Sequence, residues 1–350
     1  MVWSLLLLFG VLFAAGAAFA AAVVWLMARA MLRPPRMTDG KAAWVLQRLS
    51  PGDLDLRYED LAFDVRDVRT GRPLRMTAWW IPHPAARGKC VVLLHGYADA
   101  KVGAIAWAPT WHALGFDILA LDLRAHGYSG GDETTAGYYE RHDVEQVINQ
   151  LRASRPEATR QVVLFGASMG ATVAAAVAAR GGEAGDGGEA GDGGGTGVAA
   201  LVLESPYGDF RTSAEAHMDA LGAPGPLFQR AALRLAERMS GANFDEIRMP
   251  ALLRRVRCPV MVIAPVDDPF SRREEVEAMG AALQCNEAAA GVSAFWKVED
   301  AHHLTAVTRD PEQYRQRLAA FLAGALPTTA VEATPATKPV VAAHPASVSP

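Results

Sequence analysis

Residues 162–170 read Val-Val-Leu-Phe-Gly-Ala-Ser-Met-Gly, and the rest of the chain is arranged around this stretch. An apolar, β-branched run ends at Gly166, a serine follows at position 168, and an alanine-rich helical pattern runs from Ala171 to Ala179. This order predicts a strand, a sharp turn and a helix. A serine at such a turn stands above a sheet, where the free N–H groups of the helix N-terminus favour developing negative charge.

The two glycines of this G-x-S-x-G pattern have a steric explanation. A serine at a strand-to-helix turn has strained backbone angles, and neighbouring chain segments pass close to its flanks. Side chains at positions 166 and 170 are therefore expected to collide with them. The motif alone is a weak signal, because a glycine-rich turn after a buried strand produces the same pattern. Its meaning depends on finding partners for Ser168.

The N-terminal segment is built for a membrane. No charged side chain occurs before Arg29, and residues 5–27 are almost wholly apolar. This exceeds the roughly 20 residues that cross a bilayer as a helix. We expect a single-pass transmembrane anchor over residues 1–32. The alternative is a secretory signal peptide with a cleavage site at residues 18–20, which read Ala-Phe-Ala.

Basic residues follow this segment at once, namely Arg29, Arg33, Arg36 and Lys41. The positive-inside rule then places the following domain on the cytoplasmic side. A periplasmic or extracellular domain is the alternative.

The rest of the chain divides by composition. We expect a linker and leading helix over residues 33–55, a globular domain over 56–326 and a disordered tail over 327–350. Within the domain, a tandem repeat of six residues, at 183–188 and 189–194, predicts a flexible Gly-rich loop over 181–197. The formal net charge of −4 and the even mixing of charges argue against a nucleic-acid partner. The 3 cysteines suit neither a disulfide framework nor a zinc site.

Short apolar runs along the domain predict its sheet. Residues 61–65 and 76–81 read as a hairpin. Six further runs lack clean alternation, as in strands covered on both faces, and lie at 91–94, 118–121, 162–165, 200–203, 260–264 and 294–298. Helical periodicity lies between them, for example at 144–151, and again near the end at 314–322. The predicted fold is α/β, with a mostly parallel central sheet and helices on both faces.

Candidate partners of Ser168 follow the last two strands. A serine hydroxyl needs an adjacent base, and the base needs a third group to hold it. In an open α/β sheet such groups meet at the carboxyl ends of the strands. Asp267 and Asp268 follow the strand at 260–264, and His302 and His303 follow the strand at 294–298.

The order serine, acid, histidine resembles the α/β-hydrolase superfamily, over roughly residues 56–326. The segment Leu94-His95-Gly96-Tyr97 and residues 122–129, which read Asp-Leu-Arg-Ala-His-Gly-Tyr-Ser, also resemble family segments. The resemblance implies a catalytic triad of Ser168, Asp268 and His303, with Asp267 as the second choice for the acid. Pro265 stands where the family's acid loop commonly has glycine. The resemblance also implies an oxyanion hole built from the backbone N–H groups of Tyr97 and Met169.

The implied activity is that of a serine hydrolase with a small lid, similar to esterases, lipases and serine aminopeptidases, which needs no organic cofactor and no metal. The lid is expected at about residues 205–257, where Leu221, Leu227, Phe228 and Leu233 are candidates to line an acyl pocket. The membrane segment favours a carboxylic or lipid-like ester or thioester as substrate. A serine peptidase or acyltransferase with the same triad, and a silent binding module, are the alternatives.

Five histidines are expected on the surface or in packing, namely His83, His112, His142, His217 and His344. The sequence does not predict the oligomeric state.

Overall fold

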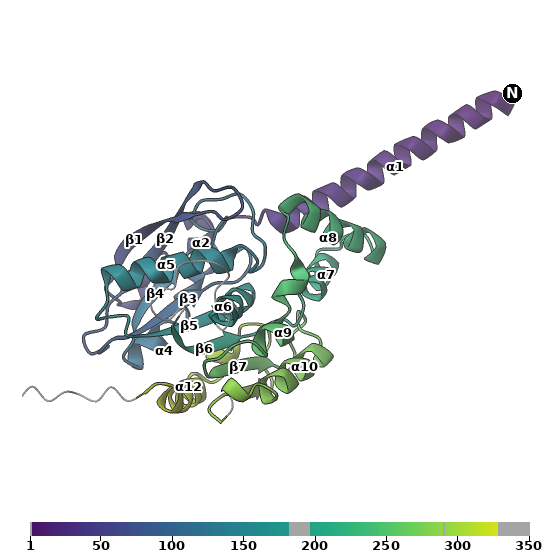
Figure 1. Cartoon of the computed structure of the whole chain (residues 1–350). Helices are drawn as coiled ribbons and strands as arrows, with labels where there is room; N and C mark the ends of the chain where they lie inside the picture. The colour runs from purple at the N-terminus through teal and green to yellow at the C-terminus, as the bar shows by residue number, and fades with distance from the viewer. Residues whose placement is uncertain (1, 182–196, 290, 328–350) are drawn as a thin grey trace, which may run out of the picture.

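In the computed structural model, which describes residues 2–181, 197–289 and 291–327, one 8-stranded sheet runs through the domain (Figure 1). Its order is β1-β2-β4-β3-β5-β6-β7-β8. The strands are β1 (Glu59–Arg66), β2 (Pro73–Ile81), β3 (Lys89–Leu94), β4 (Asp117–Leu121), β5 (Gln161–Ala167), β6 (Val198–Glu204), β7 (Val260–Pro265) and β8 (Ala294–Val298). β2 pairs antiparallel with β1 and β4, and all other neighbours are parallel. The predicted hairpin and the mostly parallel sheet are confirmed.

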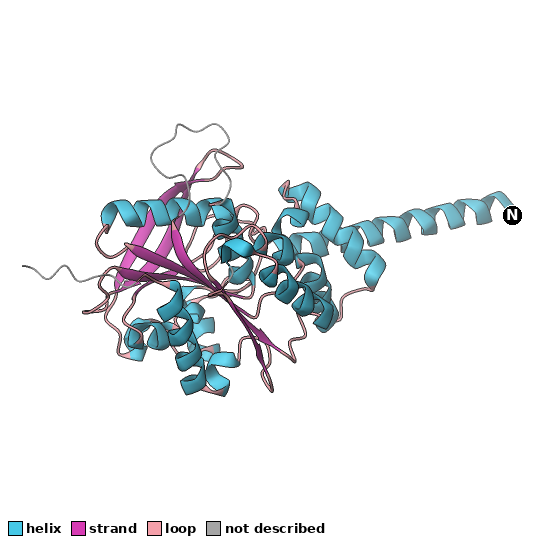
Figure 2. Ribbon diagram, turned by 60° about the horizontal axis from the view of Figure 1, so that its bottom comes forward, coloured by secondary structure: helices cyan, strands magenta, loops and turns pink. Residues whose placement is uncertain are grey.

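Helices cover both faces of this sheet (Figure 2). One face packs against the end of α1 (Val2–Leu32), α5 (Glu140–Ser154), α6 (Met169–Arg180), α8 (Pro226–Ser240), α9 (Met249–Leu253) and α10 (Arg273–Gln284). The other packs against α2 (Asp39–Val45), α3 (Lys101–Ala104), α4 (Ala108–Ala113), α11 (Ala306–Arg309) and α12 (Pro311–Ala325). β3 to β6 are nearly fully buried because both faces are covered, which explains their continuous apolar runs.

The predicted lid segment contains α7 (Phe210–Ala220), α8, the 3₁₀ turn η2 (Phe244–Ile247) and α9. Two further 3₁₀ turns, η1 (Pro51–Leu54) and η3 (Glu287–Ala289), lie outside it. α7 and α8 form a helical layer beside the sheet, on the side where α1 enters the domain (Figure 1). Nearly all of the predicted Gly-rich loop, at residues 182–196, and the predicted tail from residue 328 lie outside the described residues.

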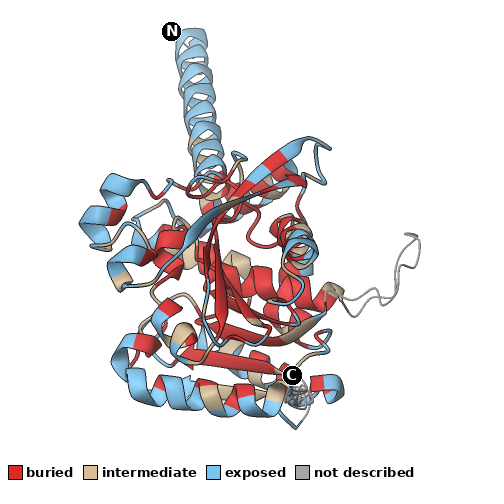
Figure 3. Cartoon of the chain, turned by 90° about the vertical axis from the view of Figure 1, so that its left-hand side faces the viewer, coloured by how far each residue is buried: buried red, intermediate tan, exposed pale blue. Residues whose placement is uncertain are grey.

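α1 has two unlike parts. Its N-terminal part projects from the domain and is exposed along its length (Figure 3), and it is long and apolar enough to cross a membrane. These properties suit a membrane span and a signal sequence alike. The last turns differ, because Ala28 and Leu32 are buried against the domain. α1 ends at Leu32, just before the Arg-Pro-Pro-Arg sequence of residues 33–36, where proline cannot continue a helix.

Candidate active site

Ser168 occupies the turn between β5 and α6, with a left-handed φ of 53° and a ψ of −115°. A methyl carbon built on Gly166 would lie 2.2 Å from the Gly170 carbonyl oxygen, and one built on Gly170 would lie 2.1 Å from that of Leu94. Neither distance is possible for a side chain, so both positions require glycine. The Ser168 N–H donates to the Glu204 carbonyl at 2.9 Å, which ties the turn to the neighbouring strand.

His303 and Asp268 lie beside Ser168, on the loops that follow β8 and β7. The His303 Nδ1 is 2.7 Å from the Asp268 Oδ2, and its Nε2 is 3.0 Å from the Ser168 Oγ. With the proton on Nδ1, the ring donates to the carboxylate and its Nε2 accepts from the serine hydroxyl. The three side chains therefore form one continuous hydrogen-bonded chain.

The neighbouring acid and histidine point elsewhere. Asp267 is exposed, and its backbone carbonyl is 3.4 Å from the Nδ1 of the exposed His302. Asp268 is buried, and its Oδ1 accepts the Phe270 N–H at 2.9 Å. Of the two acids that the sequence offers, the structure brings Asp268 to the imidazole.

Tyr97 and Met169, the predicted oxyanion donors, both line one cavity with Ser168. Residue 96 lies directly against the serine, because a methyl carbon built on Gly96 would be 3.4 Å from the Ser168 Cβ. The buried His95 fixes this loop, with its Nε2 accepting the Leu123 N–H at 3.0 Å and its Nδ1 donating to the Gly96 carbonyl at 2.7 Å. Burial lowers the pKa of His95 to about 3, which keeps the ring neutral in this role.

The cavity in front of Ser168 has a volume of about 220 Å³. Its lining is almost wholly apolar and comes from α1, the loop at Tyr97, the turn at Ser168, and the segment from residue 207 to residue 223. α7 contributes Ala214 and Met218, and α1 contributes Met27, Ala30 and Met31. This shape and chemistry suit an apolar chain attached to a reacting carbonyl.

The predicted pocket residues divide. Leu221 lines the cavity, whereas Leu227 is 80% exposed and lies outside the lining. Leu233 packs in a small cluster with Ala214 and Met218, and the half-buried Phe228 lies outside the lining too. Only one of the four predicted side chains therefore reaches the cavity. An amphipathic helix also buries residues against its neighbours, and the sequence pattern does not separate the two uses.

His217, which the sequence places on the surface or in packing, lines the cavity. Its ring stacks on Phe270 at 3.8 Å between centroids, and Phe270 in turn packs edge-on against His303 at 4.9 Å. Its Nδ1 donates to the Ser213 carbonyl at 2.8 Å, and burial lowers its pKa. Phe210, Ala214, His217 and Leu221 follow one another at helical spacing. This spacing is the sequence signal that identifies the face of α7 that lines the cavity.

Glu204, at the carboxyl end of β6, is a buried acid for which the sequence analysis predicts no role. Its Oε2 accepts the Tyr314 hydroxyl at 2.5 Å and the Trp107 indole N–H at 3.0 Å. Burial raises its pKa to about 7. Because the Glu204 backbone also accepts the Ser168 N–H, this group forms part of the floor beneath the serine turn.

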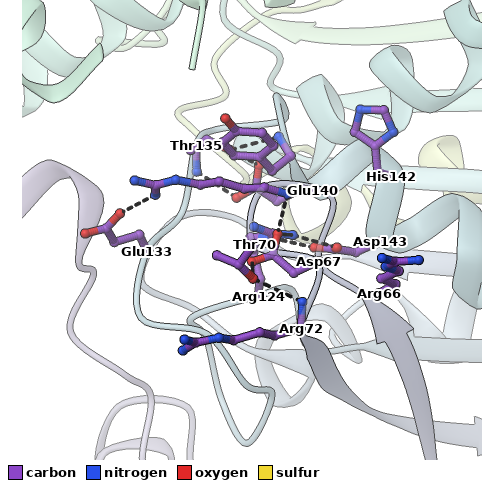
Figure 4. Close-up of polar contacts among 12 residues, drawn as sticks. Arg66, Asp67, Thr70, Arg72, Arg124, Glu133, Thr135, Glu140, His142 and Asp143 are labelled. Atoms are coloured by element: carbon purple, nitrogen blue, oxygen red, sulfur yellow. Dashed lines mark hydrogen bonds and ion pairs between the residues drawn. The ribbon is translucent and has the colours of Figure 1, made fainter. Parts of the chain in front are cut away.

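A buried polar network holds the loop after β4 (Figure 4). Arg124 donates to both carboxylate oxygens of Asp143, at 2.5 and 2.7 Å, and to Asp67 at 3.3 Å. Glu140 accepts the N–H and the hydroxyl of Thr135. The network fixes a loop that lies against α6, where the Thr134 hydroxyl is 3.6 Å from the Met169 sulfur.

The described residues show no metal centre, since no three His, Cys, Asp or Glu side chains within them group as ligands. The cysteines Cys90, Cys258 and Cys285 are free. Chemistry without a cofactor stays an expectation from the sequence.

Comparison with known proteins gives one family. The model of the alpha/beta hydrolase family matches residues 91–317. The protein YqkD of Bacillus subtilis is 25% identical over 238 residues, which are 66% of this chain and 70% of YqkD. Among solved structures, the Pyrococcus furiosus esterase Pf2001 superposes with a TM-score of 0.63 at 24% identity, over 85% of this chain and 99% of the esterase. An alpha-beta hydrolase from Vibrio vulnificus gives a TM-score of 0.56 at 16% identity, over 84% and 89% of the two chains.

Proposed function

The chain belongs to the alpha/beta hydrolase family, and we propose that it is a membrane-anchored serine hydrolase that cleaves a carboxylic ester or thioester through an acyl-enzyme. The observation that carries this proposal is the hydrogen-bonded chain from Asp268 through His303 to Ser168, with distances of 2.7 and 3.0 Å. The link from Ser168 to His303 has the length that proton transfer between a nucleophile and its base requires, and the link from His303 to Asp268 is a hydrogen bond that orients the base.

In the first half of the reaction, the Ser168 Oγ attacks the acyl carbon while His303 Nε2 takes the hydroxyl proton. Asp268 holds the ring and stabilises the imidazolium. The N–H groups of Tyr97 and Met169 stabilise the oxyanion, and the loss of one such donor typically costs about 3 kcal/mol of transition-state stabilisation. The alcohol or thiol then leaves with the proton from His303 Nε2.

In the second half, water attacks the acyl-enzyme and gives its proton to His303 Nε2. The tetrahedral intermediate collapses, the carboxylic acid leaves, and the proton returns to the Ser168 Oγ. The apolar cavity beside Ser168 supports an acyl group as the part of the substrate held by the enzyme.

The membrane anchor in this proposal is α1. Its length and apolar composition support a single span, and Arg29, Arg33, Arg36 and Lys41 favour a domain on the cytoplasmic side. Ala28 and Leu32, beyond the alternative cleavage site, are buried in the domain, which supports a role for the end of α1 in the folded protein.

The test is labelling of the detergent-solubilised protein with a fluorophosphonate probe. We expect labelling of the wild type and none of Ser168→Ala. The same variant should lose about 10⁴-fold or more in kcat/KM on p-nitrophenyl esters. Its melting temperature should stay near that of the wild type, since the hydroxyl makes its one described side-chain bond to His303. A folded wild type that takes no label would favour a silent binding module instead.

A further inference from the structure

The cavity beside Ser168 is closed on one side by the helix proposed as the anchor. Met27, Ala30 and Met31 of α1 line it together with Ser168. Tyr97, from the predicted oxyanion loop, donates its hydroxyl to the Ala30 carbonyl at 2.7 Å. The end of the anchor and the reacting serine therefore share one wall.

This end of α1 is held firmly against the domain. The Arg36 guanidinium donates to the carbonyls of Gly127, Ser129 and Gly131 at 2.8, 2.7 and 2.6 Å. The Thr134 N–H donates to the Leu32 carbonyl at 2.8 Å. These contacts fix the position of the last turns, so the cavity wall is a built part of the domain.

The boundary of a bilayer around α1 falls next to this wall. Trp3 and Trp25 are exposed at 84% and 44%, and tryptophan prefers the interfaces at the two sides of a membrane. At 1.5 Å per residue the two lie about 33 Å apart along the helix, close to the hydrocarbon thickness of about 30 Å. The Arg29 guanidinium carbon lies 5.3 Å from the centroid of the Trp25 ring. At this depth its positive charge would meet a headgroup phosphate. Met27 is thus within one turn of the hydrocarbon.

The rim of the cavity is apolar and exposed on the same side. Leu221, which lines the cavity, is 86% exposed. α8 packs against α1, and its exposed face carries Arg230, Arg234 and Arg238 at intervals of one turn. None of the three has an ion-pair partner among the residues that the structure describes. An apolar rim with unpaired arginines beside it suits a surface of anionic lipid headgroups.

We propose that the substrate is a long-chain acyl ester of the bilayer itself, which enters sideways along α1 so that its chain lies between α1 and α7 and its carbonyl reaches Ser168. This inference rests on the proposed hydrolase function for the reaction, but the occupancy of the cavity by a bilayer chain is a separate property. The anchor is then part of the substrate site and sets the distance between that site and the membrane.

The occupancy test uses the full chain with Ser168→Ala, in vesicles of phosphatidylethanolamine and phosphatidylglycerol that contain a monoacylglycerol with a diazirine on its acyl chain. After irradiation, mass spectrometry maps the labelled residues. We expect label on the α7 face around Ala214 and Met218, which are buried and line the cavity. Label confined to residues 2–26 would overturn the proposal.

Two neighbouring substitutions on α1 give a matched pair. Met27→Trp fills the cavity and should lower labelling of Met218 at least tenfold. Leu26→Trp lies on the exposed side of the same turn, outside the lining, and should keep labelling within twofold of the parent. Equal labelling in both variants would contradict the proposed path. If Met27→Trp folds poorly, Met218→Trp takes its place. It blocks the cavity from the opposite wall and should lower labelling of Met31.

Activity separates this inference from the reaction on which it rests. In proteins with Ser168 intact, Met27→Trp should lower the ratio of kcat/KM for dodecanoyl over butanoyl p-nitrophenyl esters at least tenfold, and Leu26→Trp should leave that ratio unchanged. An unchanged ratio in both variants would contradict the acyl path. If the wild type takes no fluorophosphonate label, the proposed hydrolase function is contradicted. Photolabelling would still test whether a bilayer chain occupies the cavity.

Discussion

The two sides of the site are built in different ways. On the catalytic side, so named for the candidate triad, Ser168 stands at a turn so crowded that a methyl carbon at Gly170 would lie 2.1 Å from a backbone oxygen. On the cavity side, Met27 and Met31 of α1 pack against Ala214 and Met218 of α7. In the loop that leads from α7 to α8, a methyl carbon at Gly225 would meet nothing within 4 Å.

The difference assigns separate tasks to backbone and side chains. Backbone crowding at the carboxyl edge of a buried sheet leaves Ser168 and its turn little freedom to move. Side chains on helices at the surface tolerate substitution and so are free to set the length and shape of the acyl group. Changes on the catalytic side should abolish turnover, and changes on the cavity side should alter substrate choice.

After the loss of Ser168 itself, the largest expected effect is that of changing the acid. Asp268→Asn should lower kcat/KM about 10³- to 10⁴-fold for esters of every acyl length, because the imidazole loses the carboxylate that orients and stabilises it. Asp267→Asn is the matched control and should stay within twofold of the wild type. Steady-state kinetics on p-nitrophenyl esters measures both. A loss that grew with acyl length would contradict this division of tasks, since it would mean that Asp268 also influences which acyl group is accepted.

A smaller effect is expected from one added methyl group. Gly170→Ala should lower the free energy of unfolding by about 3 kcal/mol, because the Leu94 backbone has to move away from the new carbon. Gly225→Ala should lower it by about 1 kcal/mol or less, because the space is open and the φ of −58° suits alanine, and the remaining cost is that of alanine at the N-cap of α8. Urea unfolding of the two variants gives the numbers. Similar losses in both would mean that the cavity side is as crowded as the catalytic side.

The smallest effect concerns pH and the floor of the catalytic side. Burial raises the pKa of Glu204 to about 7 from 4.5. Between these values the folded chain keeps a proton that the unfolded chain has lost, so the free energy of unfolding falls as pH rises. Glu204→Gln removes this contribution and should gain about 2 kcal/mol over the wild type between pH 5 and pH 8. Urea unfolding at both pH values measures it, and an equal pH dependence of wild type and variant would contradict it.

The local parts of the fold could be predicted from the sequence. Every predicted strand is present, because continuous apolar runs and turn residues act over a few positions. The predicted hairpin is longer in the structure, with β2 beginning at Pro73, because pairing with β1 extends it beyond its apolar residues.

The candidate site could be predicted only in part. Ser168, a histidine at 302 or 303 and an acid at 267 or 268 follow from strand ends, since parallel strands bring those ends to one edge. Which acid faces the imidazole depends on the loop between β7 and α10, where Asp268 turns inward and Asp267 outward. The place of His217 in the cavity lining and the exposure of the arginine row of α8 depend on how α7 and α8 pack on the domain.

The sheet, the order of the candidate catalytic residues and an apolar N-terminal helix can therefore be predicted from the sequence, because each is encoded in residues close together along the chain. Only the tertiary structure decided that Met27, Ala30 and Met31 of that helix face Ser168. No pattern marks these residues, since a helix made for a membrane is apolar on all sides. Their role arises from docking, through Arg36 and Leu32, against a loop far away in the sequence.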